Sequence, residues 1–357
     1  MAGQADAHHG TSEIRPAHRF DVPRLESWLS RHLEGFSGPL TARQFSGGQS
    51  NPTYLLETPG RQYVLRRKPP GVLLASAHAV EREHRVISAL AGAGFPVPRA
   101  YVLCEDPEVI GTAFYVMQRV EGRVLWDPAL PELPKAERRG IHAAFIETLA
   151  QLHKLDVAAL GLSDFGRPGN SFVRQIGRWS KQYQAEPEAG RLPDMDLLVE
   201  WLPTHVPPGD ETALLHGDYR LDNVMFDKAG ARVLAVIDWE LSTLGHPLAD
   251  FTYLLLMYHM PQSLMKTLTG LDPVALGVPT EREAVDIYCA AAGRRPLASL
   301  DFYHAYNLFR FAAICHGIRG RLLKGNASSE QAERYARSVE PLAELALQHA
   351  RNAGLEA

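Results

Sequence analysis

The sequence HGDYRLDN at residues 216–223 begins the stretch that decides the fold, and it continues through VMF (224–226) and RVLAVI (232–237) to Asp238. The first eight residues have the composition of a polar loop, the two apolar runs are β-rich, and residues 227–230 between them have turn composition. A turn in the middle of that tetrapeptide places residues whose numbers add up to about 460 opposite each other in an antiparallel pair. The stretch therefore predicts a β-hairpin with Asn223 and Asp238 side by side at its open end.

Asn223 and Asp238 offer oxygen atoms of the kind that suit Mg²⁺, which takes few protein ligands together with substrate phosphates. A second carboxylate, Asp218, precedes Asn223 by five residues. An acid that accepts or orients a hydroxyl proton, an Asn ligand and a metal-binding Asp after a hairpin form the phosphoryl-transfer layout of protein kinases. Asp and Asn are also common turn formers, but their order around a hairpin favours Asp218 as a catalytic residue and the other two as metal ligands.

The composition is that of an ordinary globular protein, with 45% apolar and 22% charged residues in a chain of 357. The net charge of -4 argues against nucleic-acid binding, and the three cysteines are widely spaced and fit a reducing, cytoplasmic location. Residues 1–10 lack the pattern of a signal peptide, and the apolar run at 253–258 is too short to cross a membrane. We expect a cytoplasmic protein that acts on a small molecule, with no nucleic-acid or membrane partner.

The order of expected elements indicates two lobes. A helix at 18–34 precedes strand-like runs, and a second helix interrupts them; the strands are expected at 41–45, 53–57, 62–67, 99–104 and 113–119, and the second helix at 77–91. Helical spacing follows at 139–155, 172–185 and 194–202 and dominates after Asp250. The pattern predicts an α+β, protein-kinase-like two-lobe fold: an antiparallel, β-rich N-terminal lobe (1–120, with its leading helix) and a larger, mostly helical lobe (121–357) that holds the catalytic loop and the acceptor site.

The first lobe contains candidate nucleotide contacts. Gly47 and Gly48, followed by Ser50 and Asn51, lie between two expected strands, where glycines let backbone N–H groups approach an anion. Glycine pairs in hairpins also simply make turns. On the strand at 62–67, Arg66 shares a face with Val64, so one basic group can face the nucleotide. A carboxylate on the following helix could pair with it and hold it against the phosphates.

A later strand offers a second set of candidate contacts. Residues 116–120 lie where a hinge strand would present backbone groups to adenine, with Met117 and Val120 as candidate contacts, although buried apolar strand residues are usually only core. Asp222 and Glu240 are further carboxylates near the hairpin, for which we expect solvated or supporting roles.

Several of these motifs resemble the aminoglycoside phosphotransferase family of small-molecule kinases. The HGD at 216–218 and the IDWE at 237–240 replace the corresponding protein-kinase motifs. The resemblance to the family extends from about residue 43 to 250. It implies ATP and Mg²⁺ as cofactors. Aligned on the family's pattern, the strand cation is Arg66, where the family usually has Lys, and the helix carboxylate is Glu83; Lys68 remains an alternative phosphate contact. The resemblance also implies that His153 is structural and that Asp250 braces the catalytic loop near His216.

Three further stretches are similar to the kinase-like module fused to, or accompanying, acyl-CoA dehydrogenases: YVLRRKPPG (63–71), SAHAVERE (76–83) and FPVP (95–98). For that subgroup the implied acceptor is a hydroxyacyl-CoA. Residues 289–324 contain five arginines and a lysine against the lone acid Asp301, which favours an anionic acceptor, although a solvated helix face explains the excess nearly as well.

Two other functions remain open at this point. One is phosphorylation of aminoglycosides or other sugar amines. The other is a nucleotide-binding pseudokinase that regulates a partner; Arg66 in place of Lys permits it, whereas the intact Asp218, Asn223 and Asp238 speak against it.

Overall fold

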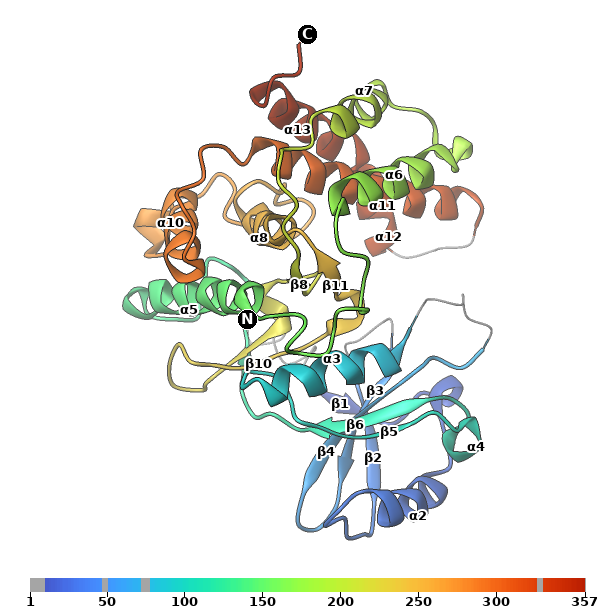
Figure 1. Cartoon of the computed structure of the whole chain (residues 1–357). Coiled ribbons are helices and arrows are strands. Elements are labelled where there is room, and N and C mark those ends of the chain that lie inside the picture. The colour runs from blue at the N-terminus through green and yellow to red at the C-terminus, as the bar shows by residue number, and fades with distance from the viewer. Residues whose placement is uncertain (1–9, 47–50, 72–77, 326–329, 357) are drawn as a thin grey trace. The chain divides into compact units, whose positions relative to one another are not determined.

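The structure is a computed structural model that describes residues 10–46, 51–71, 78–325 and 330–356 (Figure 1). By their contacts the residues form two compact units. Unit 1 comprises 1–124, 223–229 and 233–242, and unit 2 comprises 125–222, 230–232 and 243–357. The expected lobe boundary at 120/121 assigns the hairpin after residue 222 to the second lobe, whereas its contacts group its strands with unit 1.

Unit 1 is built on a six-stranded antiparallel sheet with the strand order β1-β2-β3-β4-β6-β5. Its strands are β1 (Thr11–Ser12), β2 (Thr41–Phe45), β3 (Thr53–Glu57), β4 (Gln62–Arg67), β5 (Ala100–Cys104) and β6 (Phe114–Gln118). The predictions for β2, β3 and β4 are confirmed to the residue, and those for β5 and β6 within one residue at either end. β1 is a two-residue strand that was not predicted, since so short a run leaves no alternating pattern.

Helices cover this sheet because alternate strand residues point to opposite faces. Tyr54, Leu56 and Tyr63 share a buried apolar cluster with Leu25 and Leu29 of α2 (Val22–His32). On the strands β5 and β6 lies α3 (Val80–Gly92), which Figure 1 shows across the sheet. The unit also contains the short helices η1 (Pro16–His18), α4 (Pro107–Ile110) and η5 (Trp239–Leu241).

The helix at 18–34 was predicted too long at its start. The helix α2 begins at Val22 because the Asp21 side chain accepts a hydrogen bond from the Arg24 backbone N–H at 2.9 Å, a standard N-terminal cap. The helix α3 likewise begins three residues later than predicted, after His78, whose φ of 63° is not helical.

The predicted hairpin is present in unit 1 and belongs to a three-stranded sheet of order β10-β9-β7. Its strands are β7 (Arg123–Val124), β9 (Val224–Phe226) and β10 (Val233–Val236), and the polar loop before β9 ends in the short helix η4 (Leu221–Asn223). Val224 pairs with Val236 and Met225 with Ala235, so the predicted register is confirmed, with a shift only near Val233. The unpredicted β7 pairs with β9.

A glycine allows the chain to enter β7. A side chain at Gly122 would put its Cβ 2.7 Å from the Phe226 carbonyl oxygen, which is too close for any other residue. Gly122 is therefore a point of close backbone approach within unit 1.

Unit 2 is mostly helical. Its elements are α5 (Lys135–Lys154), α6 (Ser171–Gln184), η2 (Pro187–Ala189), α7 (Pro193–Trp201), η3 (Leu202–Thr204), β8 (Ala213–Leu215), β11 (Thr243–Gly245), α8 (Pro247–Leu255), η6 (Leu256–Tyr258), α9 (Pro273–Leu276), α10 (Glu281–Ala292), α11 (Asp301–Leu323), α12 (Glu330–Arg337) and α13 (Val339–Asn352). The predicted helices all occur, with ends that differ by up to four residues. The pair β8 and β11 was not predicted because three-residue strands show no periodicity.

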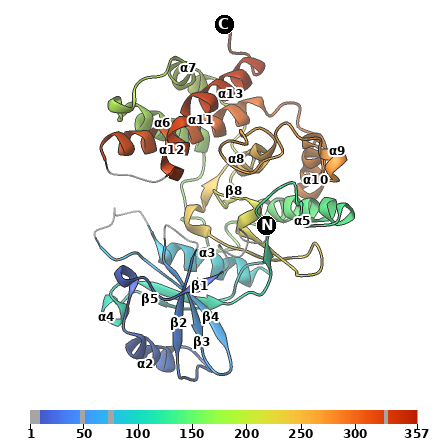
Figure 2. The same cartoon turned by 180° about the vertical axis from the view of Figure 1, so that it is seen from behind.

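The long helix α11 organises the larger core of unit 2, packing against α6, α12 and α13 as both views show (Figures 1 and 2). Phe309, Ala312 and Leu342 are fully buried in this core. The helices α5 and α10 form a second packed pair. No helix in the described part of the chain is both long enough and apolar enough to cross a membrane.

Candidate nucleotide and catalytic residues

The buried Arg66 pairs with three carboxylates of unit 1. Arg66 stands on β4 opposite Thr53 of β3 and Tyr115 of β6, and only 7% of its surface is exposed. Its guanidinium contacts three carboxylates at 2.7–3.1 Å: Nε lies 3.1 Å from Glu83 Oε2, and Nη2 lies 2.7 Å from Asp238 Oδ1 and 3.0 Å from Glu240 Oε2. The structure thus brings together Arg66, Glu83 and Asp238, three of the residues that the sequence proposed for the nucleotide and its metal.

Three carboxylates share one cation in this cluster. Burial raises the pKa of Glu83 to about 7; Arg66 opposes this rise, and Asp238 and Glu240 add to it. Burial also works against the charge of Arg66, yet Glu83 and Asp238 outweigh it and raise the pKa of Arg66. The cluster is short of positive charge, which is the electrostatic condition that favours a divalent cation.

Glu240 is a cluster member that the sequence reasoning had assigned a solvated or supporting role. The Oε2 atom of Glu240, which accepts from Arg66, also accepts a hydrogen bond from Asn51 Nδ2 at 3.1 Å. Asn51 Oδ1 in turn lies 3.1 Å from His78 Nδ1. Asn51 is 1% exposed. This predicted phosphate contact therefore orients Glu240 in the structure, while Gly47, Gly48 and Ser50 lie outside the described residues.

The two candidate cations, Lys68 and Arg66, have different carboxylate partners. Lys68 Nζ lies 2.9 Å from Glu81 Oε2 at a half-exposed position, whereas Arg66 pairs with the buried Glu83. Next to Arg66 on its face of β4, Val64 pairs across the sheet with Met117 of β6. Met117 and Val120 are both half-buried, so each keeps some surface accessible.

The two predicted metal ligands lie at the mouth of the hairpin. The Ile237 N–H donates to the Asn223 carbonyl at 2.9 Å, which extends the β9–β10 ladder to Asn223. Asp238 follows directly with φ of 65°. A left-handed backbone at a residue other than glycine costs about 1–3 kcal/mol and is typical of functional sites. The Asp238 side chain remains 33% exposed, so one face of its carboxylate is open.

Asp218 lies in unit 2, where a phenol donates a hydrogen bond to its carboxylate and a guanidinium lies nearby. The Tyr253 hydroxyl donates to Asp218 Oδ1 at 2.5 Å, and Arg220 Nε lies 3.5 Å from the same oxygen. Burial raises the pKa of Tyr253 well above its ordinary value, so the phenol stays protonated and remains a donor. Arg220 also pairs with Asp222 at 2.6 Å, which leaves Asp222 engaged in an ion pair.

The loop that begins at His216 is held by Asp250 of α8. Its carboxylate accepts the backbone N–H of His216 at 2.6 Å and of Gly217 at 2.9 Å, as expected from the sequence. His153 Nε2 lies 3.6 Å from the same carboxylate, and its Nδ1 lies 2.7 Å from the Tyr288 hydroxyl. Burial opposes ionisation of Asp250, but His153 and His216 lower its pKa below the ordinary value. Both residues therefore have the structural roles predicted for them.

Much of the excess positive charge after residue 289 is neutralised by acids from other segments. Three of its cations form ion pairs with acids from elsewhere in unit 2: Arg294 with Glu211, Arg319 with Glu340, and Lys324 with Glu186. Arg310 is different. It donates to the Gly217 carbonyl at 3.1 Å and its guanidinium lies 5.5 Å from the centre of the Tyr253 ring. Sequence counting missed these pairs because the acids are distant in the chain.

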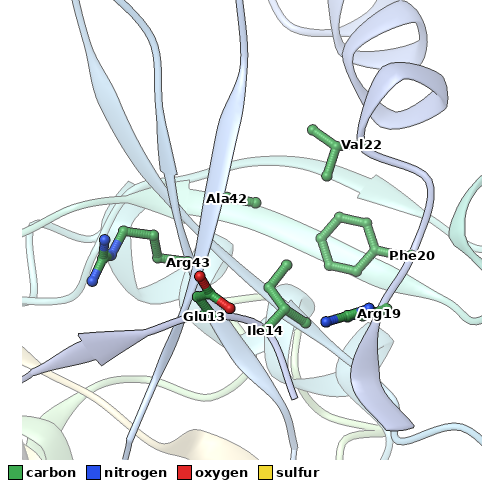
Figure 3. Close-up of a pocket in the computed structure, with 7 residues that line it drawn as sticks. All are labelled: Glu13, Ile14, Arg19, Phe20, Val22, Ala42 and Arg43. Atoms are coloured by element: carbon green, nitrogen blue, oxygen red, sulfur yellow. The ribbon is translucent and has the colours of Figure 1, made fainter. Parts of the chain in front are cut away.

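A hollow of about 440 Å³ in unit 1 contains none of the predicted site residues. It lies between β2 and the segment that leads into α2. Figure 3 shows Ile14 and Phe20 facing one another inside it, while Arg43 extends away. A mixed apolar and charged lining of this kind does not point to a nucleotide.

Comparison with known proteins identifies relatives along most of the chain. The sequence model of the phosphotransferase enzyme family (APH) matches residues 41–303. Acyl-CoA dehydrogenase family member 11 of Gallus gallus is 47% identical over 350 residues, which cover 95% of this chain and 44% of that protein. The chain therefore spans less than half of that curated relative.

Two solved structures share the fold. One is a Ralstonia eutropha protein described as a candidate aminoglycoside phosphotransferase, with a TM-score of 0.87, 47% identity and coverage of 94% of this chain and 99% of that one. The other is a thermostable mutant of an aminoglycoside phosphotransferase with ADP and hygromycin B, with a TM-score of 0.58, 15% identity and coverage of 93% and 99%. The predicted α+β, kinase-like fold and the resemblance to this family and to its acyl-CoA dehydrogenase-associated subgroup are confirmed.

Proposed function

The chain belongs to the phosphotransferase enzyme family, and we propose that it transfers the γ-phosphate of ATP, in the presence of Mg²⁺, to a hydroxyl group of a small metabolite. The observation that carries the proposal is the contact of one buried guanidinium, Arg66, with both Glu83 and Asp238. In kinases a strand cation paired to a helix carboxylate holds the donor phosphates, and an acid after the hairpin holds the metal.

Unit 1 supplies the donor side in this proposal. Arg66, fixed by Glu83, contacts the α- and β-phosphates, and Asn223 and Asp238 hold Mg²⁺ through their side-chain oxygens. An ion held by these residues would supply positive charge to the donor phosphates. Val64, Met117 and Val120 line the adenine contact. The open face of Asp238 supports its role, because a ligand of Mg²⁺ needs an accessible oxygen.

Unit 2 supplies the acceptor side. Asp218 accepts or orients the proton of the acceptor hydroxyl, and the Tyr253 hydroxyl and Arg220 fix the carboxylate in one rotamer. An ionised acid in a fixed position is what a hydroxyl nucleophile requires. Arg310, next to the Gly217 carbonyl, places a positive charge beside this loop.

We further propose that the acceptor is anionic and, specifically, a hydroxyacyl-CoA. Two observations support it: the likeness to a relative named as an acyl-CoA dehydrogenase family member, and the positions of Arg220 and Arg310 at the catalytic loop. Phosphates of CoA pair well with guanidinium groups, whereas polycationic aminoglycosides need carboxylates. The Ralstonia likeness keeps aminoglycosides as the second candidate.

The deciding experiment measures ADP release from ATP and Mg²⁺ with a panel of acceptors that includes 4-hydroxyacyl-CoA, non-hydroxylated acyl-CoA and kanamycin. We expect turnover only with the hydroxylated acyl-CoA, and none with the Asp218→Asn variant. Turnover of kanamycin alone contradicts the acceptor and leaves phosphotransfer intact. Saturable ATP binding without turnover of any acceptor favours the pseudokinase.

A further inference from the structure

A second group of polar side chains in unit 2 has no part in phosphoryl transfer as proposed above. His259 follows η6, Glu281 is the first residue of α10, and His304 lies in the first turn of α11. The Nε2 atoms of the two histidines converge on one carboxylate oxygen: His259 lies 2.8 Å and His304 3.1 Å from Glu281 Oε1. Three elements from separate parts of the chain thus bring two imidazoles and a carboxylate to one point.

We propose that His259, Glu281 and His304 bind a divalent transition-metal ion, with Zn²⁺ as the best fit. Their candidate ligand atoms all lie within 4.8 Å of one another. Ligands at about 2.0–2.1 Å from a tetrahedral Zn²⁺ are about 3.3–3.4 Å apart, so the two nitrogens, at 2.8 and 3.1 Å from the carboxylate oxygen, would each have to move slightly outward to admit the ion. Two His and one carboxylate with an open fourth position is a recurrent zinc ligand set.

The pKa shifts of His304 and Glu281 are compatible with metal binding. Burial lowers the pKa of His304 to about 4. For Glu281 burial acts in the opposite sense, but hydrogen bonds from His259 and His304 lower its pKa to about 2. At neutral pH the cluster therefore presents a neutral imidazole and an ionised carboxylate, which are the forms that bind metals without first losing a proton.

The ligand chemistry excludes the cation of the phosphotransfer reaction. Mg²⁺ and Ca²⁺ prefer oxygen ligands, whereas imidazole nitrogens select Zn²⁺ and its neighbours in the first transition row. The side chain of His304 is 4% exposed and that of Glu281 is 33% exposed, so the site has a buried side and an open side by which an ion can enter.

Neighbouring residues give the cluster a supporting layer. The ring of His349 packs 4.9 Å from that of His259 and 5.0 Å from that of His304, and its Nδ1 lies 2.8 Å from Asp301 Oδ1. The His349–Asp301 pair therefore packs against the rings of both proposed imidazole ligands and limits their movement. A bound ion would join η6, α10 and α11 and so stabilise this part of unit 2.

The test uses the whole chain, stripped of metal by a chelator and dialysed against Zn²⁺ alone, with bound metal measured by mass spectrometry. We expect one Zn²⁺ per chain and a raised thermal midpoint. His259→Gln and Glu281→Gln should each weaken Zn²⁺ binding by at least about tenfold and abolish the shift in midpoint. Mg²⁺ at the same concentration should neither bind here nor displace Zn²⁺.

Two matched variants serve as controls. Glu283→Gln changes an acid two residues along the same helix, one that caps it through Thr280 and pairs with Arg139, and His205→Gln changes a histidine of unit 2 that contacts Thr204 instead of the cluster. Both should bind Zn²⁺ like the unaltered chain. His8 and His9, outside the described residues, are present in every variant, so any ion they hold cancels. Equal Zn²⁺ binding by His259→Gln, Glu281→Gln and the controls, or none by the unaltered chain, overturns the proposal.

Discussion

The two units hold their acidic residues in opposite ways. In unit 1 the carboxylates of Glu83, Asp238 and Glu240 compete for a single buried guanidinium. In unit 2 the carboxylate of Asp218 accepts a hydrogen bond from the Tyr253 phenol and lies near Arg220, whose guanidinium also pairs with Asp222. The first arrangement lacks positive charge and gains from a cation supplied from outside. The second holds one carboxylate in place through a neighbouring hydroxyl group. This contrast is consistent with the division that we propose between a metal–nucleotide side and a proton-accepting side, and it can be tested residue by residue.

The largest effect is expected for Asp218→Asn. The amide is similar in shape to the carboxylate but cannot accept the acceptor proton, so kcat should fall by about 10³-fold, within the range of general-base catalysis. ATP binding, measured by calorimetry, should be unchanged because the donor contacts lie in unit 1. The matched control is Asp196→Asn, at an acid of α7 that pairs with Arg191. Unchanged turnover of Asp218→Asn would remove this residue from the mechanism.

A somewhat smaller loss is expected for Asp238→Asn. Asn tolerates the left-handed backbone found at this position, so the hairpin should remain intact while one charged metal ligand is lost. We predict a fall in kcat of about 10²-fold and a higher Mg²⁺ concentration for half-maximal rate. Asp227→Asn, in the turn of the same hairpin, should leave both quantities as they are. An unaltered Mg²⁺ dependence in the first variant contradicts the assignment of Asp238.

The distance along the chain between contacting residues explains what could be predicted from the sequence. The hairpin register followed from two apolar runs and a turn, which are local features, and the Arg66–Glu83 pair followed from the family's pattern. The role of Glu240 could not be predicted, because its contact with Asn51 joins residues far apart in the chain. The net positive charge after residue 289 was overestimated for the same reason, because the acids that neutralise three of the cations come from other segments. Short strands such as β7 and β8 have too few residues for a periodic signal.

An intermediate effect is expected for Tyr253→Phe, which removes only the hydroxyl that donates to Asp218. A hydrogen bond to a charged group contributes about 1.5–3 kcal/mol. The low end of that range corresponds to a fall in kcat of about tenfold, which we expect here while the KM for ATP stays the same. Because Tyr253 acts through Asp218, the pH–rate profile should also change on its acidic side. Tyr258→Phe, which loses a hydrogen bond to the Pro279 carbonyl, is the control. A rise in the KM for ATP without a change in kcat would place Tyr253 outside the acceptor side.

The smallest effect is a pH dependence of stability that originates in the crowded carboxylates of unit 1. The pKa of Glu83 is about 7 in the folded chain, above its ordinary value of 4.5. Between these two values the folded chain binds more protons than the unfolded chain. The free energy of unfolding should therefore fall as the pH rises from about 4.5 to about 7, by at most about 1.4 kcal/mol per pH unit.

Chemical denaturation at a series of pH values measures this slope. Glu83→Gln should make it shallower, whereas Glu81→Gln, at the acid that pairs with Lys68, should preserve it. If the cluster is short of positive charge because Mg²⁺ belongs there, then the positive charge of Mg²⁺ bound with ATP should favour the ionised form of Glu83. The pKa of Glu83 should then fall, and the slope should flatten in the unaltered chain as well. A slope that Mg²⁺ and ATP leave unchanged would mean that the ion binds elsewhere, and the contrast between the two units would lose its functional meaning.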